Sequence, residues 1–145
     1  MLKNKEIKSR FLNKIFSEGK KQKAEVNLLK CFKNIQKFQR SKCSKEIFKL
    51  SIKNSSPFFQ VKTIKSKGRK GSIEIPYLLS EDLRIFYGIK NLLMTTNLIR
   101  KERFYSRLNS EVTKSSSLKG MSVVNKKKLH ENAFSKRKFA RFRWF

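Results

Sequence analysis

The chain of 145 residues has few of the side chains that catalysis or metal binding requires. It contains one histidine, His130, and two cysteines, Cys31 and Cys43. These three side chains cannot complete a four-ligand zinc site, and the cysteine spacing fits no CxxC motif. The chain also lacks the GxSxG, P-loop and GxGxxG patterns. We therefore expect a protein that is not an enzyme, with reduced thiols and without a cofactor, a metal site or catalytic residues.

Acidic residues are scarce as well. Ten Asp and Glu residues oppose 37 Lys and Arg residues, which gives a formal net charge of +27. A chain with this excess repels itself unless a polyanion neutralises it. Because neutralised phosphates release counterions, nucleic acid is the first expected partner, and an anionic membrane surface is the second. No apolar run approaches the roughly 18 residues of a transmembrane helix. The apolar stripes suit mutual packing of short helices better than one long interfacial helix, so we expect no membrane partner.

Apolar residues are plentiful enough to build a core, since 38% of the chain is hydrophobic and 13 residues are Phe. Their spacing predicts six helices. The expected ranges are about 7–16, 23–38, 44–54, 81–96, 102–116 and 122–134. We expect Gly19 to end the first helix, and Ser44 and Ser80 to cap the third and fourth.

The fourth expected helix is apolar over a wide arc, which favours it as the central core helix. Arg84 and Lys90 should lie on its solvent side. Residues expected to face inward include Leu50, Leu83, Phe86, Val124 and Phe134.

Between the third and fourth helices the apolar period changes to two, in residues 58–63 and 72–75. The segment 64–71 between these runs contains two glycines, so the pattern predicts a β-hairpin at about 58–76 that Pro76 closes. A two-stranded hairpin is marginal in water. We expect an arm that projects from the helical body and is ordered by its partner. An ordinary polar loop tip is the alternative.

The C-terminal run 119–145 is dense in Lys and Arg and ends in aromatic residues. On an RNA surface, such cations can contact phosphates, and the aromatic rings can stack on bases or riboses. The alternative is a solvated basic helix whose aromatic residues dock on its own core. Together the patterns predict a single, mainly α domain over 1–145, with about six helices and one protruding two-stranded β-hairpin arm. A basic aromatic tail is expected at about 135–145.

The order of these motifs resembles the small-subunit ribosomal protein S-seven family in its universal, bacterial-type form. Residues 11–32 are similar to its first two helices and Gly-Lys-Lys turn. Residues 47–63 resemble its third helix, Asn-x-x-Pro turn and first hairpin strand, and 72–76 its returning strand. Residues 119–144 resemble the end of the family. Matching residues include Asn54, Pro57, Val61, Gly120, His130 and Ala133.

The resemblance implies a structural constituent of the small ribosomal subunit. It implies binding to the 3′ major domain of the small-subunit ribosomal RNA (rRNA), a part in nucleating assembly of the subunit head, and a place near the exit-site tRNA and the mRNA path. Neighbouring head proteins would be further partners. The implied nucleic-acid-binding residues are Lys20, Lys21, Lys23, Lys62, Lys65, Lys67, Arg69, Lys70, Arg84, Lys136, Arg137, Arg141, Arg143 and Trp144.

The chain departs from the family in a short basic N-terminal arm and a hairpin tip that is about two residues longer. This divergence and the Lys-, Asn- and Phe-rich composition predict a mitochondrial member, with the plastid or the bacterial cytoplasm as alternatives. A basic DNA-binding organellar nucleoid protein is the alternative function, although residues 122–125 make a poor start for a recognition helix. A membrane-surface protein is a third alternative.

Overall fold

The computed structural model describes residues 4–16, 18–39, 43–65, 72–99 and 102–143. Its elements are α1 (Asn4–Ile15), α2 (Lys21–Phe38), α3 (Ser44–Ser55), β1 (Phe59–Lys65), β2 (Ser72–Leu78), α4 (Glu81–Leu98), α5 (Phe104–Ser116), α6 (Met121–Ser135) and the 3₁₀ helix η1 (Arg137–Phe142). The prediction of a mainly helical domain with one antiparallel hairpin is confirmed. The described ranges hold one helix more than expected, because the basic aromatic tail begins as η1.

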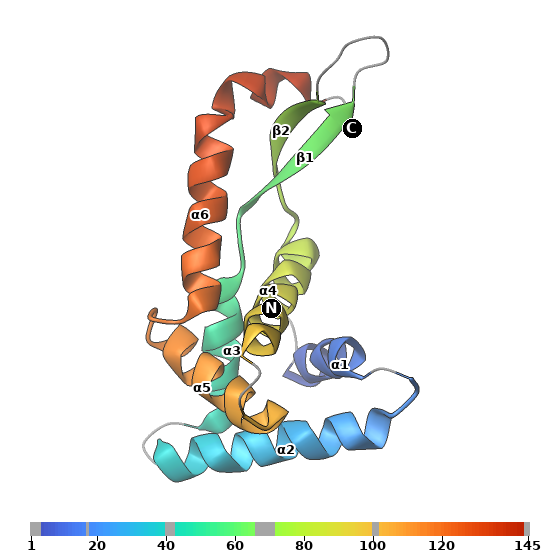
Figure 1. Cartoon of the computed structure of the whole chain (residues 1–145), viewed down its shortest axis with the longest axis vertical. Coiled ribbons are helices and arrows are strands. Elements are labelled where there is room, and N and C mark those ends of the chain that lie inside the picture. The colour runs from blue at the N-terminus through green and yellow to red at the C-terminus, as the bar shows by residue number, and fades with distance from the viewer. Residues whose placement is uncertain (1–3, 17, 40–42, 66–71, 100–101, 144–145) are drawn as a thin grey trace.

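The molecule is elongated, and its two ends are built differently (Figure 1). At one end α2 lies across the other helices, with α1 beside it. Helices α3, α4 and α5 pack against one another in the middle. At the other end the hairpin stands beside α6, and η1 packs against β2. Helix α6 and the hairpin therefore form one extension of the helical body.

The core lies where α1, α2, α3, α4 and α5 meet. Its fully buried apolar side chains include Phe11, Leu28, Ile35, Leu92 and Leu108. At its centre the ring of Phe48 contacts Phe11 edge-on at a centroid distance of 4.8 Å and Phe32 at 5.2 Å. Burial of each large side chain contributes about 1.5–3 kcal/mol, so this cluster fixes how the five helices pack.

Gly19 does not end the first helix as expected, because α1 ends at Ile15. Gly19 lies instead in the turn between α1 and α2, with a φ of 71°. Glu18 before it also has a positive φ, of 54°. A left-handed conformation costs an L residue roughly 1–2 kcal/mol, which explains a glycine at the second position. Because the turn is complete at Gly19, α2 begins at Lys21 and not at the expected position 23.

Two details of the expected helix starts were wrong. Ser44 is the first residue of α3, and Cys43 precedes it as the cap residue without a side-chain cap bond. The backbone N–H of Ser44 donates instead to the side-chain oxygen of Gln36, 3.2 Å away. Ser80 does stand at the N-cap of α4, but its hydroxyl makes no cap bond either.

Several large apolar residues expected in the core are exposed. Leu50, Leu83, Phe86, Val124 and Phe134 all lie at the surface. In α3 the inner positions include Ser51 and Ser55, whose hydroxyls donate to the carbonyl oxygens of Phe48 and Ser51. Because each hydroxyl is satisfied within its own helix, these small residues can be buried and let neighbouring helices approach closely.

The hairpin pairs β1 with β2 in antiparallel register, with Val61 opposite Pro76. The expectation that Pro76 closes the hairpin was wrong, because β2 continues to Leu78. Both strands of a two-stranded sheet are edge strands, so a proline can be accommodated without breaking the ladder. The arm is also anchored at its base, where Ile75 and Leu79 are buried. None of the helices in the described ranges is long and apolar enough to cross a membrane.

Candidate nucleic-acid interface

Apart from Arg84 on α4, the expected nucleic-acid-binding cations that the structure describes fall into two groups at opposite ends of the long axis (Figure 1). We call Lys20, Lys21 and Lys23, at the start of α2, the turn region. The arm-tail region comprises β1, β2 and the tail, and its expected cations within the described ranges are Lys62, Lys136, Arg137, Arg141 and Arg143. Lys65 is the last residue of β1. Lys67, Arg69, Lys70 and Trp144 lie outside the described residues.

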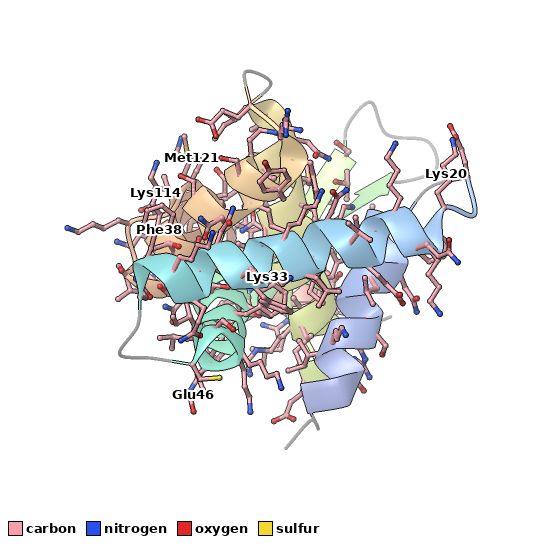
Figure 2. The ribbon with its side chains drawn as sticks, turned by 90° about the horizontal axis from the view of Figure 1, so that it is seen from below. Lys20, Lys33, Phe38, Glu46, Lys114 and Met121 are labelled. Atoms are coloured by element: carbon pink, nitrogen blue, oxygen red, sulfur yellow. The ribbon has the colours of Figure 1, made fainter. Side chains whose placement is uncertain are left out.

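The turn region is open to solvent. Lys20, Lys21 and Lys23 are all exposed, and Lys20 forms an exposed ion pair with Glu18. Lys20 and Lys23 line a surface hollow of about 350 Å³ together with Lys14, which sequence reasoning did not select. Figure 2, seen from below, shows Lys20 at the start of α2, with Lys33 and Phe38 further along that helix. Three ammonium groups thus border one concavity, a geometry that suits a phosphate backbone.

Arg84 is only half-exposed and does not lie on the solvent side of α4 as expected. Its guanidinium carbon lies 3.9 Å from the centroid of the Phe58 ring. The ammonium of Lys126 lies 5.5 Å from the same centroid and donates to the carbonyl oxygen of Asn54 at 3.0 Å. Burial, and then the neighbouring Arg84, lower the pKa of Lys126. Lys90, in contrast, is exposed as expected.

His130 joins the arm to α6. Its Nε2 accepts a hydrogen bond of 3.0 Å from the backbone N–H of Phe58. Its ring contacts Phe59 nearly edge-on at a centroid distance of 5.6 Å. Burial, and then the charge of Lys126, lower the pKa of His130. The neutral imidazole is therefore the working form, and its remaining proton is on Nδ1 because Nε2 is an acceptor.

The tail uses one cation to hold the arm and presents the others to solvent. Lys136 forms an ion pair with Glu74 of β2, and both side chains are partly buried. Arg137 and Arg141 are exposed, and their guanidinium carbons lie 4.6 Å and 5.0 Å from the ring centroids of Phe134 and Phe142. Guanidinium–ring pairs of this kind offer both positive charge and a surface for base stacking.

Between the tail and the base of the arm lies an apolar concavity of about 560 Å³, which we call the C-terminal groove. Its walls come from β1, β2, α6 and η1, and its lining residues include Phe59, Pro76, His130, Phe134, Arg137 and Arg143. The two arginines supply charge to an otherwise carbon-rich surface. No sequence pattern indicated this groove, because its walls are far apart along the chain.

Sequence reasoning also missed a buried carboxylate that supports α6. Glu111 of α5 is 3% exposed, and its Oε1 accepts the backbone N–H of Ser122 at 2.8 Å and the hydroxyl of Ser115 at 3.1 Å. A negative group at a helix N-terminus satisfies a free backbone donor and interacts favourably with the helix dipole. Glu111 thereby fixes the start of the helix that carries His130 and the tail.

The chemistry of these regions is charge and stacking. The described ranges contain no group of three or more His, Cys, Asp or Glu residues placed to hold a metal ion. Burial raises the pKa of the Cys31 thiol to about 12, so this cysteine is an inert core residue and not a nucleophile.

Comparison with known proteins gives one consistent result. A family model described as ribosomal protein S7p/S5e matches residues 2–137. The chain is 25% identical over 141 residues to small ribosomal subunit protein uS7 of Phytoplasma australiense, an alignment that covers 97% of this chain and 88% of that protein. It is 26% identical over 141 residues to the protein of the same name from Listeria welshimeri, with the same coverage.

Proposed function

Since the chain belongs to the ribosomal protein S7p/S5e family, we propose that its turn region and arm-tail region bind separate parts of the small-subunit rRNA. Membership makes the protein a structural, rRNA-binding constituent of the small ribosomal subunit, with rRNA and ribosomal proteins as partners and no enzymatic activity. The family match covers residues 2–137, so it includes the turn region and the arm and ends at the start of η1.

The observation that supports this division is the placement of exposed cations at both ends of an elongated body (Figure 1). Several acidic groups, in contrast, are engaged within the protein. The carboxylate of Asp82 accepts a hydrogen bond of 2.8 Å from the guanidinium of Arg10. Glu74 and Glu18 form ion pairs with Lys136 and Lys20. Glu111 is buried. Two of these pairs engage Lys20 and Lys136, but the other described cations of the two regions that are exposed, including Lys21, Lys23 and Arg137, can meet phosphates of different RNA segments.

We further propose that the target is the 3′ major domain, that binding helps to nucleate assembly of the subunit head, and that the arm-tail region lies near the exit-site tRNA and the mRNA path. The motif resemblance supports this placement. The candidate contacts are those given above, including Lys67, Arg69, Lys70 and Trp144. Two of these contacts already share their charge with an acid, Lys136 with the partly buried Glu74 and Lys20 with the exposed Glu18.

We also propose that the protein works in a mitochondrial small subunit. The support is compositional: the chain is rich in Lys, Asn and Phe, and its identity to the bacterial proteins is low. Plastid and bacterial ribosomes are the alternatives. Fractionation of the source cells into organelles, followed by immunodetection in each ribosomal fraction, distinguishes the three.

A binding experiment tests the rRNA assignment against the DNA alternative. A transcript of the 3′ major domain and a duplex DNA of equal phosphate number are compared at several salt concentrations. We expect the transcript to bind more tightly at every salt concentration, because a folded RNA can present phosphates to both ends of the protein. Equal affinity for both polymers would instead favour a general polyanion binder.

A further inference from the structure

The C-terminal groove has the size, lining and surrounding charge of a site for one nucleobase. We propose that it holds an unstacked base of a single-stranded RNA segment, with the adjoining phosphates on Arg137 and Arg143, an assignment that rests on the RNA-binding function proposed above. The volume of about 560 Å³ falls in the roughly 300–1,000 Å³ range of small-ligand clefts.

The walls provide the flat apolar surfaces against which bases stack. Phe59 is 39% exposed and Phe134 is 67% exposed, although a large apolar side chain is ordinarily buried. Arg137 extends the ring of Phe134 with its guanidinium, 4.6 Å from the centroid. Such an arginine can stack on a base and contact a phosphate at the same time, which an aliphatic wall cannot do.

Small residues leave space for the base. Ala133 on α6 and Ala140 on η1 both line the groove, and Pro76 closes the side formed by the arm. Ala133 is 5% exposed, so it lies at the bottom of the groove. A larger side chain at either alanine would occupy the volume that we assign to the ring.

His130 adds a polar group to this apolar surface. It lines the groove, and its Nε2 is already engaged by the N–H of Phe58. Its Nδ1 therefore carries the proton of the neutral imidazole and can donate to a carbonyl or ring nitrogen of a base. A groove with an imidazole donor beside two arginines and with stacking walls accepts an unpaired base in preference to an aliphatic chain.

Charge favours RNA over a protein segment as the occupant. Five cations follow α6 within eight residues, with no acid among them: Lys136, Arg137, Lys138, Arg141 and Arg143. The one acidic residue in the lining is Glu131, which is exposed. The apolar groove suits an aromatic ring, and the cations beside it suit negative groups on either side of that ring. A nucleotide within an RNA chain has this chemistry.

The test compares the full chain's affinity for two oligomers of about ten nucleotides. One is single-stranded oligoadenylate, and the other is the same ribose-phosphate chain with abasic residues, so that only the bases differ. We expect the wild type to bind the oligomer with bases about tenfold more tightly, since stacking is worth roughly that factor per base or more.

Two variants test whether this preference for bases arises in the groove. Ala140→Leu fills the groove, and Phe134→Ala removes an exposed wall that is not part of the buried core. Both should lower the ratio of affinities towards one while leaving affinity for the abasic chain unchanged. Asn132→Leu is the matched control, because it adds a leucine to an exposed position of α6 outside the groove lining. It should keep the wild-type ratio.

Three results would overturn the groove assignment. The wild type could bind both oligomers equally, Ala140→Leu and Phe134→Ala could keep the tenfold ratio, or Asn132→Leu could lose it as they do. If the wild type shows no base preference but binds the 3′ major-domain transcript, the groove assignment fails and the rRNA function stands. If the preference is present and the transcript is not bound, the groove assignment stands and the rRNA function fails.

Discussion

The imidazole Nε2 of His130 accepts a hydrogen bond of 3.0 Å from the backbone N–H of Phe58, although the two residues are 72 positions apart. This contact fixes the base of the arm to the middle of α6. The hydrogen bond therefore joins the arm and α6 in one unit, and it requires a neutral imidazole.

Acidification should weaken this unit. Burial, followed by the charge of Lys126, lowers the pKa of His130 from its ordinary value of 6.5. Between the two pKa values the unfolded chain binds more protons than the folded one, so this contribution to stability is complete above pH 6.5 and declines as the pH falls through that window. The loss should not exceed about 1 kcal/mol, because the ring is partly solvated.

Melting temperatures measured from about pH 8 to about pH 5 check this expectation. His130 is the only histidine, so His130→Gln removes the one side chain that ordinarily titrates in the range and keeps an acceptor. The variant should show a flatter profile than the wild type. Parallel profiles would mean that His130 does not couple protonation to folding.

Removing the buried cap should destabilise the protein more than a typical surface change. Glu111→Ala leaves the N–H of Ser122 and the hydroxyl of Ser115 without their common acceptor. We expect a loss of about 1–3 kcal/mol in the free energy of unfolding, measured by urea titration. Glu111→Gln retains an oxygen acceptor and should lose less. Equal losses in both variants would show that the charge, and not the hydrogen bonds, matters at this position.

Substitution of Gly120 should be unfavourable for steric reasons alone. A Cβ at this position would lie 2.1 Å from Oγ of Ser115 and 2.9 Å from Oε1 of Glu111. Its φ of −73° is ordinary, so Gly120→Ala would bring no backbone strain. At an uncrowded position with the same ordinary backbone conformation, Gly→Ala would stabilise the protein by about 0.4–1 kcal/mol. We expect a loss of about 1–3 kcal/mol here instead. A stabilised variant would contradict the tight approach of α5 and α6.

The two basic regions should each contribute to the salt dependence of RNA binding. For a protein that neutralises eight phosphates, raising the salt concentration from roughly 50 to 200 mM lowers the affinity for RNA about a thousandfold or more. The double variants Lys20→Ala/Lys23→Ala and Arg137→Ala/Arg143→Ala should each reduce the slope of log K against log salt by about two. Lys33→Ala changes an exposed cation of α2 outside both regions and serves as the control. If only one double variant changed the slope, only that region would bind RNA, and the proposal of two binding regions would be wrong.

The arm should bind RNA without supporting the helical core. Replacing Lys65, Lys67, Arg69 and Lys70 together by alanine should weaken binding to the 3′ major-domain transcript, since four potential phosphate contacts are lost. Helicity measured by circular dichroism should not change. A loss of helicity would show that this segment is part of the core.

Local patterns in the sequence predicted much of the fold. Ile7, Phe11 and Leu12 recur at helical spacing and are buried in α1. The alternation around Val61 predicted a strand, and it pairs in the hairpin. These features depend on neighbours within a few residues, so periodicity alone could reveal them.

What could not be predicted depends on contacts between distant segments. Arg84 was expected in solvent, but its guanidinium lies over the ring of Phe58, the residue that precedes β1. Glu111 resembles an ordinary helix acid until α6 is placed against it. The C-terminal groove exists only once Phe59 and Ala140 are brought together. On α3 the expectation failed at Leu50, which is exposed, while Ser55 is buried and its hydroxyl meets that of Ser122 from α6.

The central claim is that this protein is an rRNA-binding constituent of the small ribosomal subunit, and sedimentation tests it most directly. A lysate of the source organelle or cell is resolved on a sucrose gradient, with and without ribonuclease, and the protein is detected in each fraction. We predict that it sediments with small-subunit particles and moves to the top of the gradient after ribonuclease treatment. Its presence at the top in the untreated lysate, apart from small-subunit rRNA, would contradict the claim.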